Sequence, residues 1–100
     1  MIVNIILCDN VAAQSGDKIT TVVIDAGHGG DDPGAVGRKS KEKDITLKVA
    51  KMTGEYIKQH CPDVKVVYTR TTDKAVSLRR RAQIANENDA DLFISIHCNA

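Results

Sequence analysis

Two of the three histidines in this sequence follow apolar runs that have the composition of buried β-strands. His28 follows "VVIDAG" and His97 follows "LFISI". A lone histidine near a turn is usually only a hydrogen-bonding group, but two imidazoles that end two strands form a usable pair of zinc ligands. The joint pattern therefore indicates a metal site, provided that the fold brings the two strand ends to one place.

An open, catalytic zinc site needs a third protein ligand from the same region. Four carboxylates qualify by their position, in the loop after His28 or in the first turn of the helix that follows it: Asp31, Asp32, Glu42 and Asp44. A glutamate in a first turn is also expected without any metal, because it complements the helix dipole. The spacing alone leaves the choice among the four open.

The elements that must position these residues follow from the apolar patterns. Strands are expected over residues 19–25, 64–69 and 92–96. A first helix is expected over residues 42–59, where apolar residues recur at helical spacing: Ile45, Val49, Met52 and Tyr56. A second helix, capped by Asp73 or Ser77, is expected to carry one apolar face: Leu78, Ala82 and Ala85.

Strand, helix, strand, helix, strand is the order typical of a parallel sheet with crossover helices. We therefore expect an α/β fold with a mainly parallel sheet, in three layers α/β/α. The C-terminal ends of its strands share one edge, where ligands of open α/β sheets bind. His28 and His97 lie just past strand ends at that edge, whereas His60 lies at the opposite edge and cannot join them.

Length and composition limit the classes of function. A chain of 100 residues forms at most one domain. Its net charge of +1, with one Phe and two Tyr, argues against a nucleic-acid partner. No apolar stretch approaches the roughly 18 residues of a transmembrane helix, so no transmembrane segment is expected.

Residues 1–15 differ in composition from the rest and are expected to form a signal peptide or leader. The run "MIVNIILC" is apolar, and Val11-Ala12-Ala13 has the small residues that precede a signal-peptidase cut. A basic start is missing and the apolar run is short, so a buried first strand is the alternative. Acylation of Cys8, as in a lipoprotein, is less favoured because the bulky Leu7 precedes it.

Several segments, in this order, carry a resemblance to a known family: "VIDAGHGGDDPGAVG", "EKD" at a helix start, "TR" at a strand end, "LRRRAQIAN" and "ADLFISIHCNA". From about Ile19 to the last residue, the sequence resembles the zinc-dependent N-acetylmuramoyl-L-alanine amidases of the type-3 family, which are bacterial cell-wall amidases. The resemblance implies that His28, Glu42 and His97 bind one Zn²⁺. It also implies hydrolysis of the amide between the lactyl group of N-acetylmuramic acid and L-alanine in peptidoglycan.

The family also has a catalytic glutamate well beyond the "SIHCNA" motif. The general acid or base is therefore expected beyond Ala100, and no catalytic residue is assigned within this chain. We expect residues 19–100 to be an amidase catalytic domain that lacks its C-terminal part. A sheet cut at its third strand is expected to have an unpaired edge there, with poor stability and little turnover.

Further residues have expected roles near the functional edge. Asp25 is expected to orient a metal-bound imidazole, because such histidines usually have a second hydrogen-bonding partner. Arg70 and Asn99 are candidates for contact with substrate, although Arg70 would equally suit a brace that holds a loop through a carboxylate. Arg81 is expected to turn towards the interior of the protein.

The cysteines Cys61 and Cys98 are expected to be unpaired thiols. They are assigned to opposite edges of the sheet, farther apart than the roughly 7 Å that a disulfide spans between Cα atoms. Cys98 next to His97 would suit a Cys–His hydrolase, but consecutive strand residues point to opposite faces, which disfavours that pairing.

The main hypothesis is an exported zinc amidase of the periplasm or cell envelope that acts on peptidoglycan, with an activator protein as a further partner. A non-catalytic zinc-binding or cell-wall-binding module is the alternative from another class. A phosphate-binding loop at "GHGGDDPG" ranks last, because it lacks the lysine and the hydroxyl residue of a P-loop.

Overall fold

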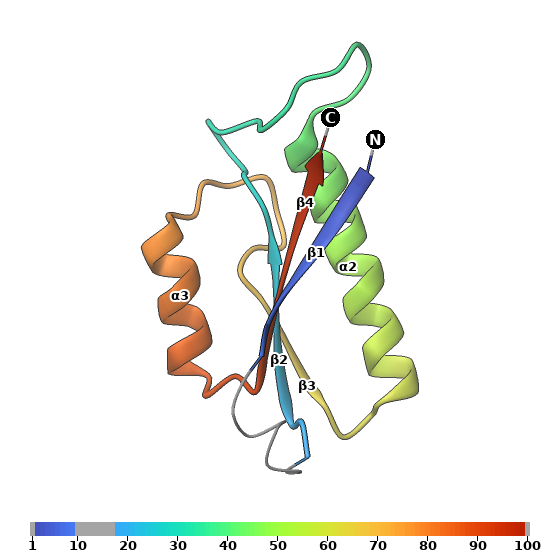
Figure 1. Ribbon diagram of the computed structural model, residues 1–100, viewed down its shortest axis with the longest axis vertical. Coiled ribbons are helices and arrows are strands. Elements are labelled where there is room, and N and C mark those ends of the chain that lie inside the picture. Colours follow the sequence, from blue (N-terminus) through green and yellow to red (C-terminus); the bar gives the residue numbers. More distant parts are fainter. Residues whose placement is uncertain (1, 10–17, 100) are drawn as a thin grey trace.

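The computed structural model describes residues 2–9 and 18–99, with residues 2–9 and Asn99 described by their backbone. Along the chain the elements are β1 (Ile2–Asp9), β2 (Thr21–Ala26), α2 (Glu42–His60), β3 (Lys65–Tyr68), α3 (Leu78–Glu87) and β4 (Leu92–Asn99). The strand order is β1-β4-β2-β3, and β2 is parallel to both of its neighbours. Helices α2 and α3 lie on opposite sides of the sheet (Figure 1). The predicted α/β fold with crossover helices is confirmed.

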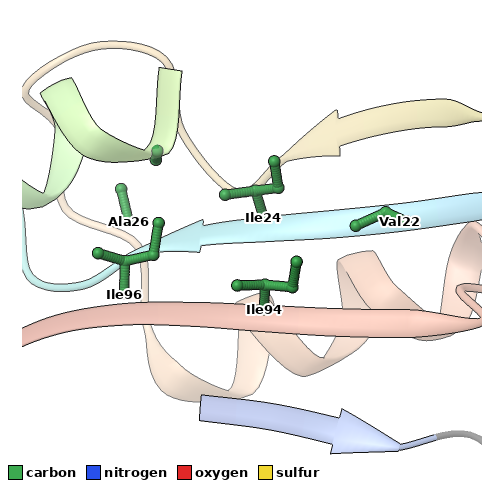
Figure 2. Packing of buried hydrophobic residues seen from close by; sticks show 6 residues of the cluster. Val22, Ile24, Ala26, Ile94 and Ile96 are labelled. Atoms are coloured by element: carbon green, nitrogen blue, oxygen red, sulfur yellow. The ribbon is translucent and has the colours of Figure 1, made fainter. Parts of the chain in front are cut away.

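Strand β2 is the centre of the core, because it has a parallel neighbour on each side. Ile24 of β2 pairs with Ile94 of β4 and with Tyr68 of β3. Figure 2 shows the labelled side chains of β2 and β4 directed to one side of the sheet, towards α2. The buried cluster on this side consists of Val22, Ile24, Ala26, Ala50, Ile94 and Ile96. This aliphatic packing holds in place the two strands that carry His28 and His97.

Helix α2 turns a face of small residues to the sheet, which differs from the expected apolar stripe. Thr46, Ala50 and Gly54 are buried, whereas Met52 and Tyr56 are 63% and 64% exposed. A Cβ at Gly54 would overlap the ring of Tyr68, so the absence of a side chain there allows the helix to approach β3. The helix was predicted correctly. Close packing requires small residues at the centre of this interface, and the larger Leu47, Val49 and Ile57 pack against the core beside them, partly buried.

Helix α3 begins after Ser77, whose hydroxyl accepts a hydrogen bond from the backbone N–H of Arg80. Ser77 is therefore the cap, and Asp73 binds the backbone N–H of Gly30 and the ammonium of Lys43 instead. The apolar face of α3 is not packed against the sheet, and Leu78 is 84% exposed. This face borders a cavity of about 400 Å³ between α3 and β4, lined in part by Leu78, Ala82, Ala85 and Phe93.

Strand β1 runs antiparallel to β4, and the pairing extends from Ile2 opposite Asn99 to Asp9 opposite Leu92. The expectation of an unpaired edge at β4 was therefore wrong, because the free backbone groups of that strand accept another extended segment. This arrangement corresponds to the strand alternative for the first residues, whereas cleavage of a leader stays a prediction. The expected cleavage site at Val11-Ala12-Ala13 lies outside the described residues. None of the described helices has the length and apolar character needed to cross a membrane.

Candidate metal centre

Three predicted ligand residues meet at the C-terminal edge of the parallel strands. His28 follows β2, Glu42 is the first residue of α2, and His97 belongs to β4. The Oε2 atom of Glu42 lies 3.0 Å from Nε2 of His28 and 3.6 Å from Nδ1 of His97. One ligand atom from each of the three residues lies within 4.8 Å of the other two. The fold thus brings together side chains that are far apart in the sequence.

These separations suit a tetrahedral metal ion. Zinc binds imidazole nitrogen and carboxylate oxygen at about 2.0–2.2 Å, which places neighbouring ligand atoms about 3.3 Å apart. The two distances from Glu42, 3.0 and 3.6 Å, lie on either side of that value. The two imidazole rings stand edge to face, with an interplanar angle of 85° and centroids 5.2 Å apart. A donor set of two imidazoles and one carboxylate is typical of zinc and other late first-row metals.

The carboxylate of Glu42 is held on both oxygens by backbone donors. The N–H of Ala35 donates to Oε1 at 3.0 Å, and the N–H of Cys98 donates to Oε2 at 2.9 Å. Glu42 is 4% exposed. Burial raises the pKa of this carboxyl, but the N–H donors of Ala35 and Cys98, together with His28, hold the pKa below its ordinary value. Glu42 is therefore an anion in a fixed orientation, as a metal ligand requires.

The imidazole of His28 projects from a tight turn. The φ angle of His28 is 65°, and Gly29 and Gly30 also have positive φ. Gly29 and Asp32 exchange two backbone hydrogen bonds, which closes the turn. The carboxylate of Asp32 then lies 2.8 Å from Nδ1 of His28 through Oδ2, while its Oδ1 accepts from the N–H of Gly34. The His28 ring thus lies between two carboxylates, those of Asp32 and Glu42.

The imidazole of His97 lies against the backbone of Gly27. A Cβ atom at Gly27 would be 2.5 Å from Cε1 and 2.6 Å from Nδ1 of His97. The N–H of Gly27 also donates to the carbonyl of Ile96, so the backbone segments before the two histidines are joined directly. Gly27 is needed at this place because any side chain would displace the His97 ring.

A second cavity, of about 370 Å³, opens beside the two histidines. Both histidines contribute to its wall, and the beginning of α3 forms another side. The lining residues are Asp25, His28, Asp32, Val76, Ser77, Leu78, Arg81 and His97. A ligand that contacts a metal held by the cluster therefore has space next to it.

A family of known proteins matches most of this sequence. Residues 22–100 match the Amidase_3 family of N-acetylmuramoyl-L-alanine amidases. The chain belongs to this family. It is 44% identical over 89 residues to the N-acetylmuramoyl-L-alanine amidase AmiA of Escherichia coli K12, an alignment that covers 88% of this chain and 30% of AmiA.

Solved structures of related proteins have the same fold. Cwp6 from Clostridium difficile superimposes with a TM-score of 0.77 at 44% identity, over 86% of this chain and 14% of Cwp6. The catalytic domain of CwlV, an amidase from Paenibacillus polymyxa, gives a TM-score of 0.74 at 42% identity, over 81% of this chain and 46% of CwlV. The chain spans less than half the length of each of these relatives.

In this member of the amidase family, Asp25 was expected to orient an imidazole, but its hydrogen bonds go to other groups. Its Oδ1 accepts from the guanidinium of Arg81 at 2.6 Å and from the hydroxyl of Thr69, and its Oδ2 accepts from the hydroxyl of Ser95. Asp25 lies within β2, before the turn. Its side chain therefore contacts α3 and residues of the neighbouring chain segments. The carboxylate next to an imidazole is Asp32, which the sequence offered as a candidate ligand.

Arg70 is a brace, the second of its two expected roles, although it holds carbonyls and not a carboxylate. Its guanidinium donates to the carbonyls of Ala26, Gly27, Thr72 and Lys43, and it is 3% exposed. Burial, followed by the charge of Arg81, lowers the pKa of Arg70. These contacts occupy the side chain that was a candidate for substrate. The side chain of Asn99, the other candidate, lies outside the described part of the chain, so its role stays a prediction.

Arg81 turns to the interior, as predicted, and fastens the turn that carries His28. It is 6% exposed, and it donates to the carbonyls of Val76, Ala26 and His28 as well as to Asp25. Two buried guanidinium groups, those of Arg70 and Arg81, therefore meet at the end of β2. They donate to backbone carbonyls at and just beyond the end of that strand.

The cysteines and the third histidine agree with the sequence analysis. Cys61 and Cys98 are unpaired thiols, one exposed and one buried. Burial raises the pKa of the Cys98 thiol, and the charge of Glu42 raises it further. His60 ends α2 far from the cluster, and its ring lies against that of Tyr56.

Sequence reasoning missed three contributions to this site: the turn contact of Asp32, the contact of Gly27 with His97, and the carbonyl contacts of the two arginines. The "HGGDD" segment contained a signal for the first, because consecutive glycines allow the chain to turn back so that a carboxylate faces the imidazole four residues earlier. The long arginine side chains gave no such signal, since their partners are backbone atoms.

Proposed function

We propose that His28, Glu42 and His97 bind one Zn²⁺. The convergence of their ligand atoms within 4.8 Å, in a chain of the amidase family, is the observation that carries the proposal. The carboxylate of Glu42 and the two imidazoles suit a dication, and the hydrogen bonds from Ala35 and Cys98 orient the carboxylate before any ion binds. When bound, zinc polarises a carbonyl group and makes a water molecule nucleophilic near neutral pH.

We further propose that the reaction is hydrolysis of the amide between the lactyl group of N-acetylmuramic acid and L-alanine in peptidoglycan. Family membership supports this reaction, and the cavity beside both histidines provides space for the substrate. The buried arginines keep the walls of the cavity in place, because they hold the carbonyls of Ala26, Gly27 and His28.

Amide cleavage also requires a group that protonates the leaving nitrogen. Among the described residues that line the cavity, the carboxylates are Asp25 and Asp32. Asp25 is paired with Arg81, and Asp32 contacts His28 and the N–H of Gly34. We therefore assign the proton donor to a residue beyond Ala100, and expect little turnover from residues 1–100 alone.

A chimera tests this proposal. Residues 22–100 would replace the matching segment of the E. coli amidase AmiA, and release of stem peptides from purified peptidoglycan would be measured. We expect hydrolysis that stops on addition of a chelator, returns with zinc, and is lost with Glu42→Gln. Zinc binding and cell-wall binding without cleavage would favour the alternative, a non-catalytic module. Failure to bind zinc would contradict both functions.

Because its substrate lies outside the cytoplasm, we propose that the protein is exported to the periplasm or cell envelope. Residues 1–15 would serve as a leader, residues 19–100 would belong to the catalytic domain, and an activator protein would be a further partner. Mass spectrometry of the protein recovered from the cell envelope tests the leader, since cleavage near Ala13 removes the residues of β1.

A further inference from the structure

We propose that Asp32 is a positioning residue for the metal: it fixes the proton of His28 on Nδ1, so that Nε2 presents its lone pair beside Glu42. This inference rests on the proposed zinc site. The contact between Oδ2 of Asp32 and Nδ1 of His28 is 2.8 Å long, and on the other side of the ring Nε2 is 3.0 Å from Glu42. Of the two ring nitrogens, the one that faces Glu42 is therefore the ligand atom.

The turn holds the Asp32 carboxylate in this place although the residue is exposed. The backbone groups of Gly29 and Asp32 exchange hydrogen bonds of 2.8 and 3.0 Å, and the N–H of Gly34 donates to Oδ1 at 3.1 Å. Asp73 accepts from the N–H of Gly30. Lys43 joins the carbonyl of Gly30 to Asp73, which ties the turn to α2. The backbone of the turn thus fixes both the position of Asp32 and the orientation of its carboxylate.

Only a carboxylate satisfies both neighbours of this side chain. The N–H of Gly34 is a donor, and the Nδ1 of a metal-binding His28 must also be a donor, so both oxygens at position 32 have to accept. An asparagine has one oxygen and one NH₂ group. If its oxygen accepts from Gly34, its NH₂ group faces Nδ1 and favours the tautomer with the proton on Nε2. In the reverse orientation, two N–H groups face each other at Gly34.

Glu42 opposes Asp32 when no metal is present, because its carboxylate lies on the Nε2 side of the same ring. The two carboxylates then compete for the single proton of a neutral imidazole. A metal ion that binds both Nε2 and Glu42 removes this competition and leaves the proton to Asp32. The informative quantity is therefore how the fraction of His28 with its proton on Nδ1 changes between variants, and not this fraction in one protein.

The experiment compares the full chain with Asp32→Asn, Asp32→Ala and Asp31→Asn. The last is a matched control, because Asp31 is exposed and makes no side-chain hydrogen bond or ion pair among the described residues. Zinc affinity is measured by competition with a chromophoric chelator. Nitrogen chemical shifts of ¹⁵N-labelled His28 report its tautomer in the metal-free protein. They are measured at a pH high enough that the ring is neutral. Circular dichroism checks that each variant is folded.

A residue that hydrogen-bonds the free ring nitrogen of a metal-bound histidine contributes about 10- to 100-fold to metal affinity. We expect zinc binding to weaken by that factor in Asp32→Asn and Asp32→Ala, with no change in Asp31→Asn. The fraction of His28 with its proton on Nδ1 should fall in Asp32→Asn relative to the unmodified chain. Unchanged affinity and unchanged tautomer in Asp32→Asn overturn the inference, even if zinc binds well. Should the unmodified chain bind no zinc, the proposed metal site fails, and the tautomer change still decides the role of Asp32.

If the Asp32 variants do not fold, the zinc-bound unmodified chain still provides a test. There, the Nδ1 proton of His28 should be visible and protected from exchange with water by its hydrogen bond to Asp32. Rapid exchange of this proton would contradict the inference without any substitution.

Discussion

The backbone N–H of Cys98 donates a hydrogen bond of 2.9 Å to Oε2 of Glu42, the carboxylate oxygen that also faces both imidazoles. This bond joins the first residue of α2 to the strand that carries His97. Glu42, one of the three proposed ligands, is thus oriented by the backbone of the strand that supplies another, His97. The cluster is complete only when α2 lies against β4, so the integrity of the sheet and that of the metal centre should be lost together.

Glu42→Gln is expected to weaken zinc binding by at least about 100-fold. Loss of a direct ligand should cost no less than loss of a residue that only hydrogen-bonds a ligand. An amide also cannot accept hydrogen bonds from both Ala35 and Cys98 as the carboxylate does. A chelator competition assay measures the affinity. Asp44→Asn is the control, because Asp44 is exposed in the same helical turn. Equal affinities of the two variants would remove Glu42 from the metal site.

Gly27→Ala is expected to weaken zinc binding through His97. The added methyl group would lie 2.5 Å from Cε1 of His97, so the ring has to move from its place opposite Glu42. Gly37→Ala is the control, because the atoms nearest to its new methyl group, in Ser40, are 3.6 Å away. Binding isotherms for the two variants should differ by about 10-fold or more, a loss comparable to that of an orienting partner. A Gly27→Ala protein that binds zinc like the Gly37→Ala protein would contradict the packing argument.

Arg81→Ala is expected to destabilise the fold strongly. It leaves the carboxylate of Asp25 buried without its charged partner, and it removes donors to the carbonyls of Ala26 and His28. Removal of one member of a buried ion pair costs about 3–5 kcal/mol in the free energy of unfolding. Urea denaturation measures this change.

The neighbouring residue provides the control for that experiment. Arg80 forms an exposed pair with Glu87, and such pairs contribute about 0–1 kcal/mol. Arg80→Ala should therefore change the urea midpoint little. Similar midpoints for the two arginine variants would mean that Asp25 finds another partner in the folded protein.

Asp91 should make stability depend on pH in acid. Its carboxylate accepts from the backbone N–H groups of Thr20 and Thr21 and from the Thr20 hydroxyl, and these bonds lower its pKa below 3.8. A pKa that is lower in the folded state stabilises the protein above the unfolded value, and this contribution is lost as the pH falls through the folded pKa. The melting temperature of Asp91→Ala should lie below that of the unmodified chain at pH 7, with the difference shrinking as the pH falls from 7 through the folded-state pKa. A constant difference over that range would show that Asp91 acts by packing alone.

The parallel direction of β2, β3 and β4 and the meeting of His28 with His97 can be predicted from the sequence, because both depend on patterns that span many residues. Apolar runs at 19–25 and 92–96 indicate buried strands, and the helical segments between them require parallel strands with a common edge. The pairing of Ile2–Asp9 with β4 has no comparable signal, because a short apolar run suits a leader as well as a strand.

The contacts around the cluster could not be predicted in the same way. Asp25 and Asp32 both lie near His28 in the sequence, but the pleat turns Asp25 to Arg81 while the glycine turn brings Asp32 to the imidazole. The choice depends on φ angles of single residues, such as Gly29 and Gly30, which periodicity does not report. Similarly, the buried face of α2 is decided by how closely the helix approaches the sheet, and not by hydrophobicity alone.

His28 has a φ angle of 65°, a conformation that glycine adopts freely and other residues adopt only with strain. A pool of random variants sorted only for resistance to heat should therefore accumulate glycine or asparagine at this position. A pool sorted for zinc binding, the proposed role of His28, should retain histidine. The left-handed backbone at residue 28 thus places a proposed metal ligand at a cost in stability.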